Sequence, residues 1–167
     1  MTCKKVLGVL LSILLIFSLC ACASGENEKK KIAVIVKATD SDFWHGVEDG
    51  VYAAATELNV SVSFSGPDNE EDYSRQNEMI RAAVEDGADA IVLSAIDFEK
   101  NAQAVDDAVR AGVKVVTIDS GVQSNLAELF IGTDNFAAGE KAALAVSEMF
   151  SPGEPIRIGI VNCYEAT

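Results

Sequence analysis

From Ile32 onward, short apolar runs alternate with longer stretches in which apolar residues recur at the spacing of an α-helix. The apolar runs predict strands at 32–36, 60–64, 88–94, 113–118, 129–132 and 156–161. The helical stretches between them lie at 43–59, 70–84, 99–111 and 136–150. The first run has no polar interruption, which is typical of a parallel strand that is buried on both faces.

This alternation predicts an α/β fold, in which a doubly wound parallel sheet is joined by right-handed crossovers. Residues are few for two complete α/β domains. The sequence also stops soon after an expected strand, without the helix that should follow. We therefore expect the 167 residues to be an N-terminal fragment of a longer protein.

The first predicted helix carries a single apolar stripe. The stripe is expected to bury five residues in the core, namely Trp44, Val47, Val51, Ala54 and Leu58. Ser41 or Asp42 can cap the first turn of this helix. Gly87, after the second helix, suits the left-handed conformation that often ends a helix.

The residues before Cys22 predict a secretion signal. Two lysines precede an apolar run at 6–19 that is too short for a comfortable membrane span. The run ends in Leu-Cys-Ala-Cys at 19–22, which resembles the lipobox of bacterial lipoproteins, with Cys where Ser or Ala is commoner. The resemblance implies a signal peptide at 1–21 and a lipid on Cys22. An ordinary secretory signal, cleaved at a neighbouring alanine, is the alternative.

Cysteine usage narrows the chemistry of the mature chain. Cys3 and Cys20 leave with the signal and Cys22 would be acylated, so only Cys163 remains. This excludes an internal disulfide and a metal site built on several thiolates. Residues 22–31 are polar and predict a flexible tether, whose lysines are expected to be solvated or, alternatively, to contact anionic headgroups.

The charge balance and the motifs exclude several functions. Thirteen basic and 26 acidic residues give a net charge of −13, which argues against binding nucleic acid. The sequence has no nucleophile elbow, Walker loop or dinucleotide fingerprint, and its one histidine, His45, is expected at a surface or pocket rim. We therefore expect no cofactor, no metal and no enzymatic activity.

Polar and aromatic residues gather where the predicted strands end. The first strand is followed by Lys37, Asp40, Ser41, Phe43 and Trp44, the third by Ser94–Asp97, and the fourth by Asp119 and Ser120. In an open parallel sheet, ligands bind beside the carboxyl ends of the strands. Asp119 could accept hydrogen bonds from a polyol, and an aromatic ring could stack on a sugar.

Plainer interpretations of the same residues stay open at this point. Asp119 can simply cap a turn. Phe43 and Trp44 can simply belong to the apolar stripe of the first helix.

Four blocks of sequence, in order, resemble the sugar-type periplasmic binding proteins of the ribose-binding class. They are Lys31–Val36 with the aromatic pair after it, Gly87–Val92, Gly112–Asp119 and Ile131–Asn135. The resemblance covers nearly all of residues 31–161. It implies two α/β lobes that close on a ligand around a hinge.

On this resemblance, residues 32–133 form the N-terminal ligand-binding lobe, and 134–167 form a hinge crossing and the incomplete start of a second lobe. Thr133, Asp134 and Asn135 resemble the first hinge crossing.

The family's ligand-binding residues can be carried over by position. Phe43 and Trp44 match the aromatic pair that packs on the sugar, Ser41 matches a polar position, and Asp119 matches the hydroxyl-binding Asp. Ser120 stands where ribose-type members have Arg, which puts ribose itself in doubt. Lys37 and the Gly-Pro at 66–67 instead resemble autoinducer receptors.

The function that the resemblance implies is delivery of a sugar or sugar-like molecule to the permease of an ABC importer. The protein would be extracytoplasmic, anchored to the membrane by the lipid on Cys22, and a monomer when full length. A sensory protein that presents its ligand to a membrane kinase or chemoreceptor is the alternative. An exported enzyme is a third hypothesis, for which the sequence offers no acid–base pair.

Overall fold

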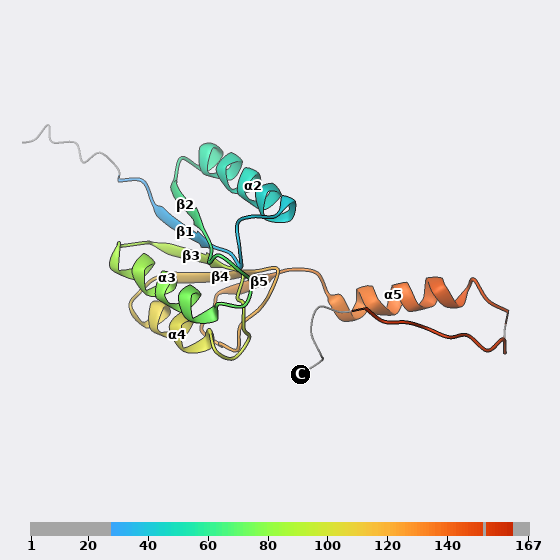
Figure 1. Cartoon of the computed structure of the whole chain (residues 1–167). Coiled ribbons are helices and arrows are strands. Elements are labelled where there is room, and N and C mark those ends of the chain that lie inside the picture. The colour runs from blue at the N-terminus through green and yellow to red at the C-terminus, as the bar shows by residue number, and fades with distance from the viewer. Residues whose placement is uncertain (1–27, 152, 162–167) are drawn as a thin grey trace, which may run out of the picture.

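The computed structural model describes residues 28–151 and 153–161, and its centre is a five-stranded parallel sheet (Figure 1). The strands lie side by side in the order β2-β1-β3-β4-β5. This arrangement confirms the predicted doubly wound α/β fold. The strand bounds are β1 (Lys31–Ile35), β2 (Ser61–Ser65), β3 (Ala90–Leu93), β4 (Lys114–Ile118) and β5 (Leu129–Ile131).

Helices cover both faces of the sheet. Helix α2 (Asp42–Leu58) lies on one face, whereas α3 (Tyr73–Glu85) and α4 (Ala102–Arg110) lie on the other (Figure 1). The chain steps from β1 outward to β2 and then returns to β3, β4 and β5 on the other side of β1. Because crossovers between parallel strands are almost always right-handed, this reversal puts the helices on opposite faces. The reversal point lies between β1 and β3.

The central strands are buried on both faces, as their apolar runs predict. In β1, Ala33 and Ile35 join the core under α3 and α4, whereas Val34 and the following Val36 join the core under α2. Successive side chains alternate between the two faces because a strand has a period of two residues. Both layers of helices therefore pack on the same strand.

Local signals set the ends of several elements. The hydroxyl of Ser41 caps α2 by accepting a hydrogen bond from the backbone N–H of Trp44 at 3.3 Å. Asp72 caps α3 in the same way. Gly87, with φ of 75°, provides the left-handed residue expected after α3.

The predicted stripe of α2 is only partly correct. Trp44 is buried, and Val47 and Val51 pack beside it, but Ala54 and Leu58 are exposed. The 17-residue helix is about 25 Å long, whereas the five residues of β1 span about 17 Å. The last turn of α2 therefore extends past the end of β1, and Leu58 adds nothing to the core there.

The prediction of a strand at 156–161 is wrong: the described residues 154–161 contain no strand. A strand needs a neighbour to pair with, and the described residues offer none there. Helix α5 (Asn135–Ser147) forms close to the predicted place but has no buried residue and projects away from the sheet (Figure 1). Within the described residues, no helix is long and apolar enough to cross a membrane.

Burial of Ile80, which is 1% exposed under the sheet, should be a main contribution of α3 to stability. Replacing Ile80 with Ala in the full-length protein should lower the free energy of unfolding by about 2–5 kcal/mol, because methylene groups are lost and a cavity is left. Leu58→Ala, at the overhanging end of α2, should change it by less than about 0.5 kcal/mol. Urea unfolding of both variants checks this, and equal losses would contradict the burial of Ile80 and the exposure of Leu58.

Candidate functional site

An ion pair joins the ends of two strands that are not neighbours. Lys37 follows β1 and Asp119 follows β4, with β3 between them, and Lys37 Nζ lies 3.0 Å from Asp119 Oδ2. The Lys37 side chain is 21% exposed and that of Asp119 is 37% exposed. The pair therefore lies at the carboxyl edge of the sheet, and both of its partners were predicted for that edge.

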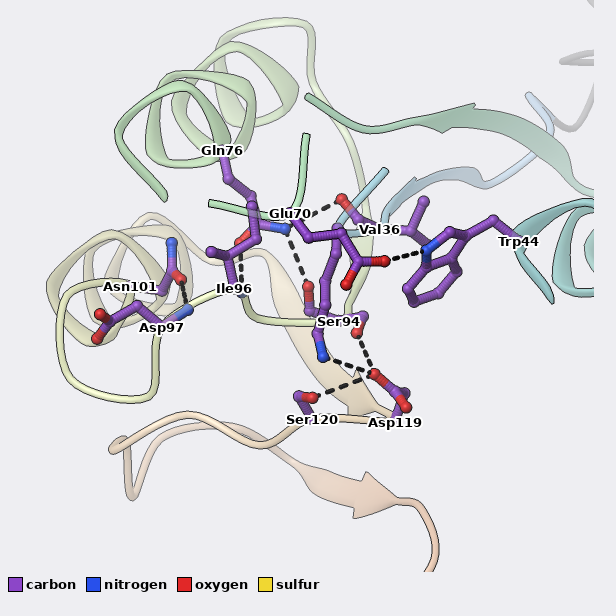
Figure 2. A network of polar contacts seen from close by, with 11 residues as sticks. Val36, Trp44, Glu70, Gln76, Ser94, Ile96, Asp97, Asn101, Asp119 and Ser120 are labelled. Carbon is purple, nitrogen blue, oxygen red and sulfur yellow. Dashed lines mark hydrogen bonds and ion pairs between the residues drawn. The ribbon is translucent and has the colours of Figure 1, made fainter. Parts of the chain in front are cut away.

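Two serine hydroxyls complete the environment of this carboxylate. Ser94, which follows β3, donates to Asp119 Oδ2 at 3.0 Å, and Ser120 donates to the same oxygen at 3.1 Å (Figure 2). All three partners thus contact Oδ2. No donor among the described residues contacts Oδ1, which leaves that oxygen for a further hydrogen bond.

The pKa of Asp119 lies below its ordinary value. Partial burial raises the pKa, because it disfavours the charged form. The hydrogen bond and the charge of Lys37, followed by the hydroxyls of Ser94 and Ser120, lower it by more. The carboxylate is therefore held in its ionised form.

The backbone at Asp119 is in the left-handed region, with φ of 57°. Asp and Asn enter this region more readily than most residues. The turn is held by the backbone N–H of Asp119, which donates to the carbonyl of Ile131 at 3.0 Å. Asp119 therefore makes a turn and also presents a carboxylate, so the two interpretations of the sequence are compatible.

A buried amide braces the strand ends behind the ion pair. Gln76 of α3 is 0% exposed, and its Nε2 donates to the carbonyls of Val36 at 3.1 Å and Ser94 at 2.9 Å. Its Oε1 accepts from the backbone N–H of Ile96 at 2.9 Å (Figure 2). Gln76 thus ties the end of β1 to the end of β3, at the point where the strand order reverses.

The two aromatic residues have different environments, and for Trp44 the prediction of a ring at the site rim is wrong. Trp44 is 2% exposed and packs on Val36 and Ala38 in the core under α2. Phe43 is 59% exposed and meets the Trp44 ring edge-on, with centroids 4.8 Å apart. Trp44 sinks because it faces the sheet from the first turn of α2, so only Phe43 is available at the surface.

The loop after β2 also reaches this edge. Gly66 lies so close to the β1 end that a Cβ there would meet the Val36 carbonyl oxygen at 3.0 Å and the Cα of Ala38 at 3.2 Å. Glu70, a few residues on, accepts a hydrogen bond from Trp44 Nε1 at 2.8 Å (Figure 2). This loop is therefore fixed against the residues on either side of Lys37.

The other predicted site residues have local roles or lie apart. Ser41 caps α2, and Asp40 and His45 are exposed. In the predicted hinge at 133–135, the Asp134 carboxylate caps α5 by accepting from the backbone N–H of Ala137 at 2.9 Å. Cys22, the signal at 1–21 and Cys163 lie outside the described residues.

The predicted ligand-binding residues do not include three residues of this edge: Ser94, Gln76 and Glu70. The sequence does place Ser94 at the edge, because it directly follows a buried strand, and its hydroxyl contacts Asp119 there. Gln76 is a polar residue within the inward stripe of its helix, which is also a detectable signal. No pattern in the sequence singles out Glu70, because its position depends on how two loops meet.

The surface around the ion pair suits an uncharged polar ligand. Lys37 and Asp119 neutralise each other, while Asp119 Oδ1 and the neighbouring hydroxyls offer hydrogen-bonding groups. The described residues contain no cluster of His, Cys, Asp or Glu that could hold a metal ion. A cavity of about 380 Å³ lies elsewhere, on the α3 side of β2 around Ser63 and Met79, and includes none of these residues.

This fold and this edge place the chain among doubly wound α/β proteins with polar side chains at the point where the strand order reverses. Residues 32–162 match the family described as "Periplasmic binding protein domain", and the chain belongs to that family.

Similar proteins include sugar-binding components of import systems. The chain is 26% identical to the ribose import binding protein RbsB of Bacillus subtilis over 164 residues, which cover 92% of this chain and 53% of that protein. It thus spans about half the length of the curated relatives that it matches.

Solved structures agree with this family. A solute-binding protein from Agrobacterium vitis with bound D-fucose is 37% identical, with a TM-score of 0.68 over 71% of this chain and 42% of that one. A solute-binding protein from Agrobacterium radiobacter in complex with D-arabinose is 33% identical, with a TM-score of 0.68 over 74% of this chain and 43% of that one.

The lowered pKa of Asp119 predicts a contribution to stability that disappears in acid. This contribution is complete above the unfolded-state pKa of about 4 and is lost as the pH falls through the lower folded-state value. Asp119→Asn should therefore lose less stability than the wild type as the pH falls from about 5 to about 2. Melting temperatures across this range check it, with Asp49→Asn on α2 as the control. Parallel curves for Asp119→Asn and the wild type would contradict the assignment.

Proposed function

We propose that this chain is part of an extracytoplasmic, lipid-anchored solute-binding protein that delivers a sugar or sugar-like molecule to an ABC importer. The observation that carries the proposal is the ionised carboxylate of Asp119, held by Lys37 and Ser94 at the reversal point of the sheet. Relatives of the same family are named for ribose import or hold D-fucose or D-arabinose. Ligands of open parallel sheets bind at this kind of edge.

The chemistry of the edge explains why a polyol is the proposed ligand. Asp119 Oδ1 can accept a hydrogen bond from a ligand hydroxyl, and Lys37 can donate to a ring or hydroxyl oxygen while it stays close to Asp119. Phe43, which is 59% exposed, offers an apolar ring for the carbon face of a sugar. Asp40, Ser41 and Ser120 would add polar contacts around it.

Ligand capture would require a second lobe opposite this edge. In this proposal, residues 32–133 form one lobe and 134–167 begin the crossing to the other, with a hinge at Thr133, Asp134 and Asn135. The ligand would favour the closed form because it contacts both lobes there, which is a population shift. The closed form would then dock on the permease, and the partner ATPase would supply the energy. The whole protein would act as a monomer.

A sensory role is the alternative, and the position of Lys37 favours considering it. Lys37 and the Gly66-Pro67 turn, which resemble autoinducer receptors, lie together at this edge, where Gly66 approaches the residues that flank Lys37. A receptor of this type would present its ligand to a membrane kinase or chemoreceptor. Genes for a permease and an ATPase beside this one would favour transport instead.

Removing the carboxylate tests the site directly. Asp119→Ala in full-length protein should weaken binding of the preferred sugar by about 1–3 kcal/mol, because the ligand hydroxyl and Lys37 lose their shared partner. Asp49→Ala, which removes an exposed carboxylate from α2, should leave the affinity unchanged. Calorimetric titration with a panel of sugars measures both. Wild-type affinity in Asp119→Ala would remove this residue from the site.

The proposal of a lipid anchor rests on the lipobox-like residues at 19–22. Lipidation of Cys22 can therefore be tested separately from ligand binding. In bacterial cells fed an alkyne fatty acid, the wild type should acquire the label and remain with the membranes. Cys22→Ala should acquire none, whereas Cys20→Ala should still be labelled because alanine is common at that position of the motif. Labelled Cys22→Ala would refute lipidation at this residue.

A further inference from the structure

The only tryptophan of the chain holds a carboxylate at the edge of the sheet. Trp44 Nε1 donates to Glu70 Oε1 at 2.8 Å (Figure 2). The Trp44 ring is 2% exposed, whereas Glu70 is exposed. A buried indole N–H needs an acceptor, and this one uses a single oxygen of Glu70. No donor among the described residues contacts the other oxygen, Oε2.

The position of Glu70 is set by backbone packing. Its loop passes Gly66, where a Cβ would meet the carbonyl oxygen of Val36 and the Cα of Ala38, the two neighbours of Lys37. Pro67, next in the loop, is buried. Together with the hydrogen bond from Trp44, these contacts bring Glu70 to the edge that carries Asp119 (Figure 2).

We propose that Glu70 is a further ligand-contacting residue, and that Trp44 is its positioning residue rather than a ring that stacks on the sugar. This proposal rests on the proposed sugar-binding function. Each of the two carboxylates has one oxygen held by protein donors and one that no donor among the described residues contacts, namely Oδ1 of Asp119 and Oε2 of Glu70. Two fixed acceptors can read the positions of two ligand hydroxyls, so Glu70 would discriminate between sugar epimers.

A purely structural role for Glu70 makes a different prediction. If Glu70 only satisfied the buried indole, any neutral acceptor of the same shape would replace it. Glu70→Gln keeps an oxygen for Trp44 Nε1 but removes the charge and places an amide N–H₂ at one terminal position. This variant should therefore retain the fold and lose part of the ligand affinity only if Glu70 contacts the ligand.

The experiment uses full-length protein, calorimetry and three probes: D-ribose, its C2 epimer D-arabinose, and D-fucose. Glu70→Gln should weaken binding of the preferred sugar by about fivefold or more, since charged hydrogen bonds are roughly twice as strong as neutral ones. The ratio of affinities for the two epimers should also move toward one. Asp68→Asn, which removes one exposed charge from the same loop, should change neither quantity.

A double-mutant cycle tests the positioning role of Trp44. Trp44→Phe keeps an aromatic ring in the core but removes the indole N–H. If Trp44 acts through Glu70, this change should weaken binding in the wild-type background and have no further effect in Glu70→Ala. Equal losses in both backgrounds would show that Trp44 affects binding by another route, and would overturn its positioning role.

The outcomes separate this proposal from the function on which it rests. Wild-type protein that binds neither these three sugars nor any other sugar of the panel contradicts the proposed function and, with it, the role of Glu70. Wild-type protein that binds a sugar, with unchanged affinity and epimer ratio in Glu70→Gln, overturns the role of Glu70 alone. Loss of affinity in Glu70→Gln but not in Asp68→Asn supports it, provided that both variants melt as the wild type does.

Discussion

The hydrogen bonds of one buried side-chain amide hold together two strand ends at the point where the strand order of the sheet reverses. Right-handed crossovers put α2 on one face and α3 on the other, so the chain leaves β1 and β3 toward opposite sides. Backbone carbonyls at the ends of two strands that separate in this way have no hydrogen-bond partner in the sheet, and burying them without one is costly. The side chain of Gln76 binds those of Val36 and Ser94, and its own oxygen is also satisfied.

The ion pair between Lys37 and Asp119 depends on the hydrogen bonds of Gln76. Val36 directly precedes Lys37, and Ser94 donates to Asp119, so Gln76 fixes the backbone of two of the groups that surround the carboxylate. An exposed lysine–carboxylate pair contributes little to stability, since solvent screens it and its side chains lose entropy. A pair whose members are already fixed avoids much of that loss. The fold therefore determines the electrostatics of this edge more than the charges determine the fold.

The sequence predicts the fold well because a period of two or 3.6 residues reports which direction a side chain faces. It predicts Lys37, Asp119 and Ser120 at one edge for a related reason, since parallel strands all end on the same side. How deeply a side chain is buried does not follow from this periodicity. Trp44 and Leu58 belong to one predicted stripe, yet the first is buried and the second is exposed, because only one lies above the sheet. The contact of Glu70 depends on two loops meeting, which no period encodes.

The requirements of the turn alone do not explain the carboxylate at position 119. A left-handed residue that bonds Ile131 could equally be Asn or Gly. Lys37, at 21% exposure, does require a negative partner, and Asp119 Oδ2 meets that need together with two hydroxyls. Contacts within the protein thus explain the role of one carboxylate oxygen of Asp119, Oδ2. The other, Oδ1, has no donor among the described residues, and a ligand hydroxyl at this edge would give it one.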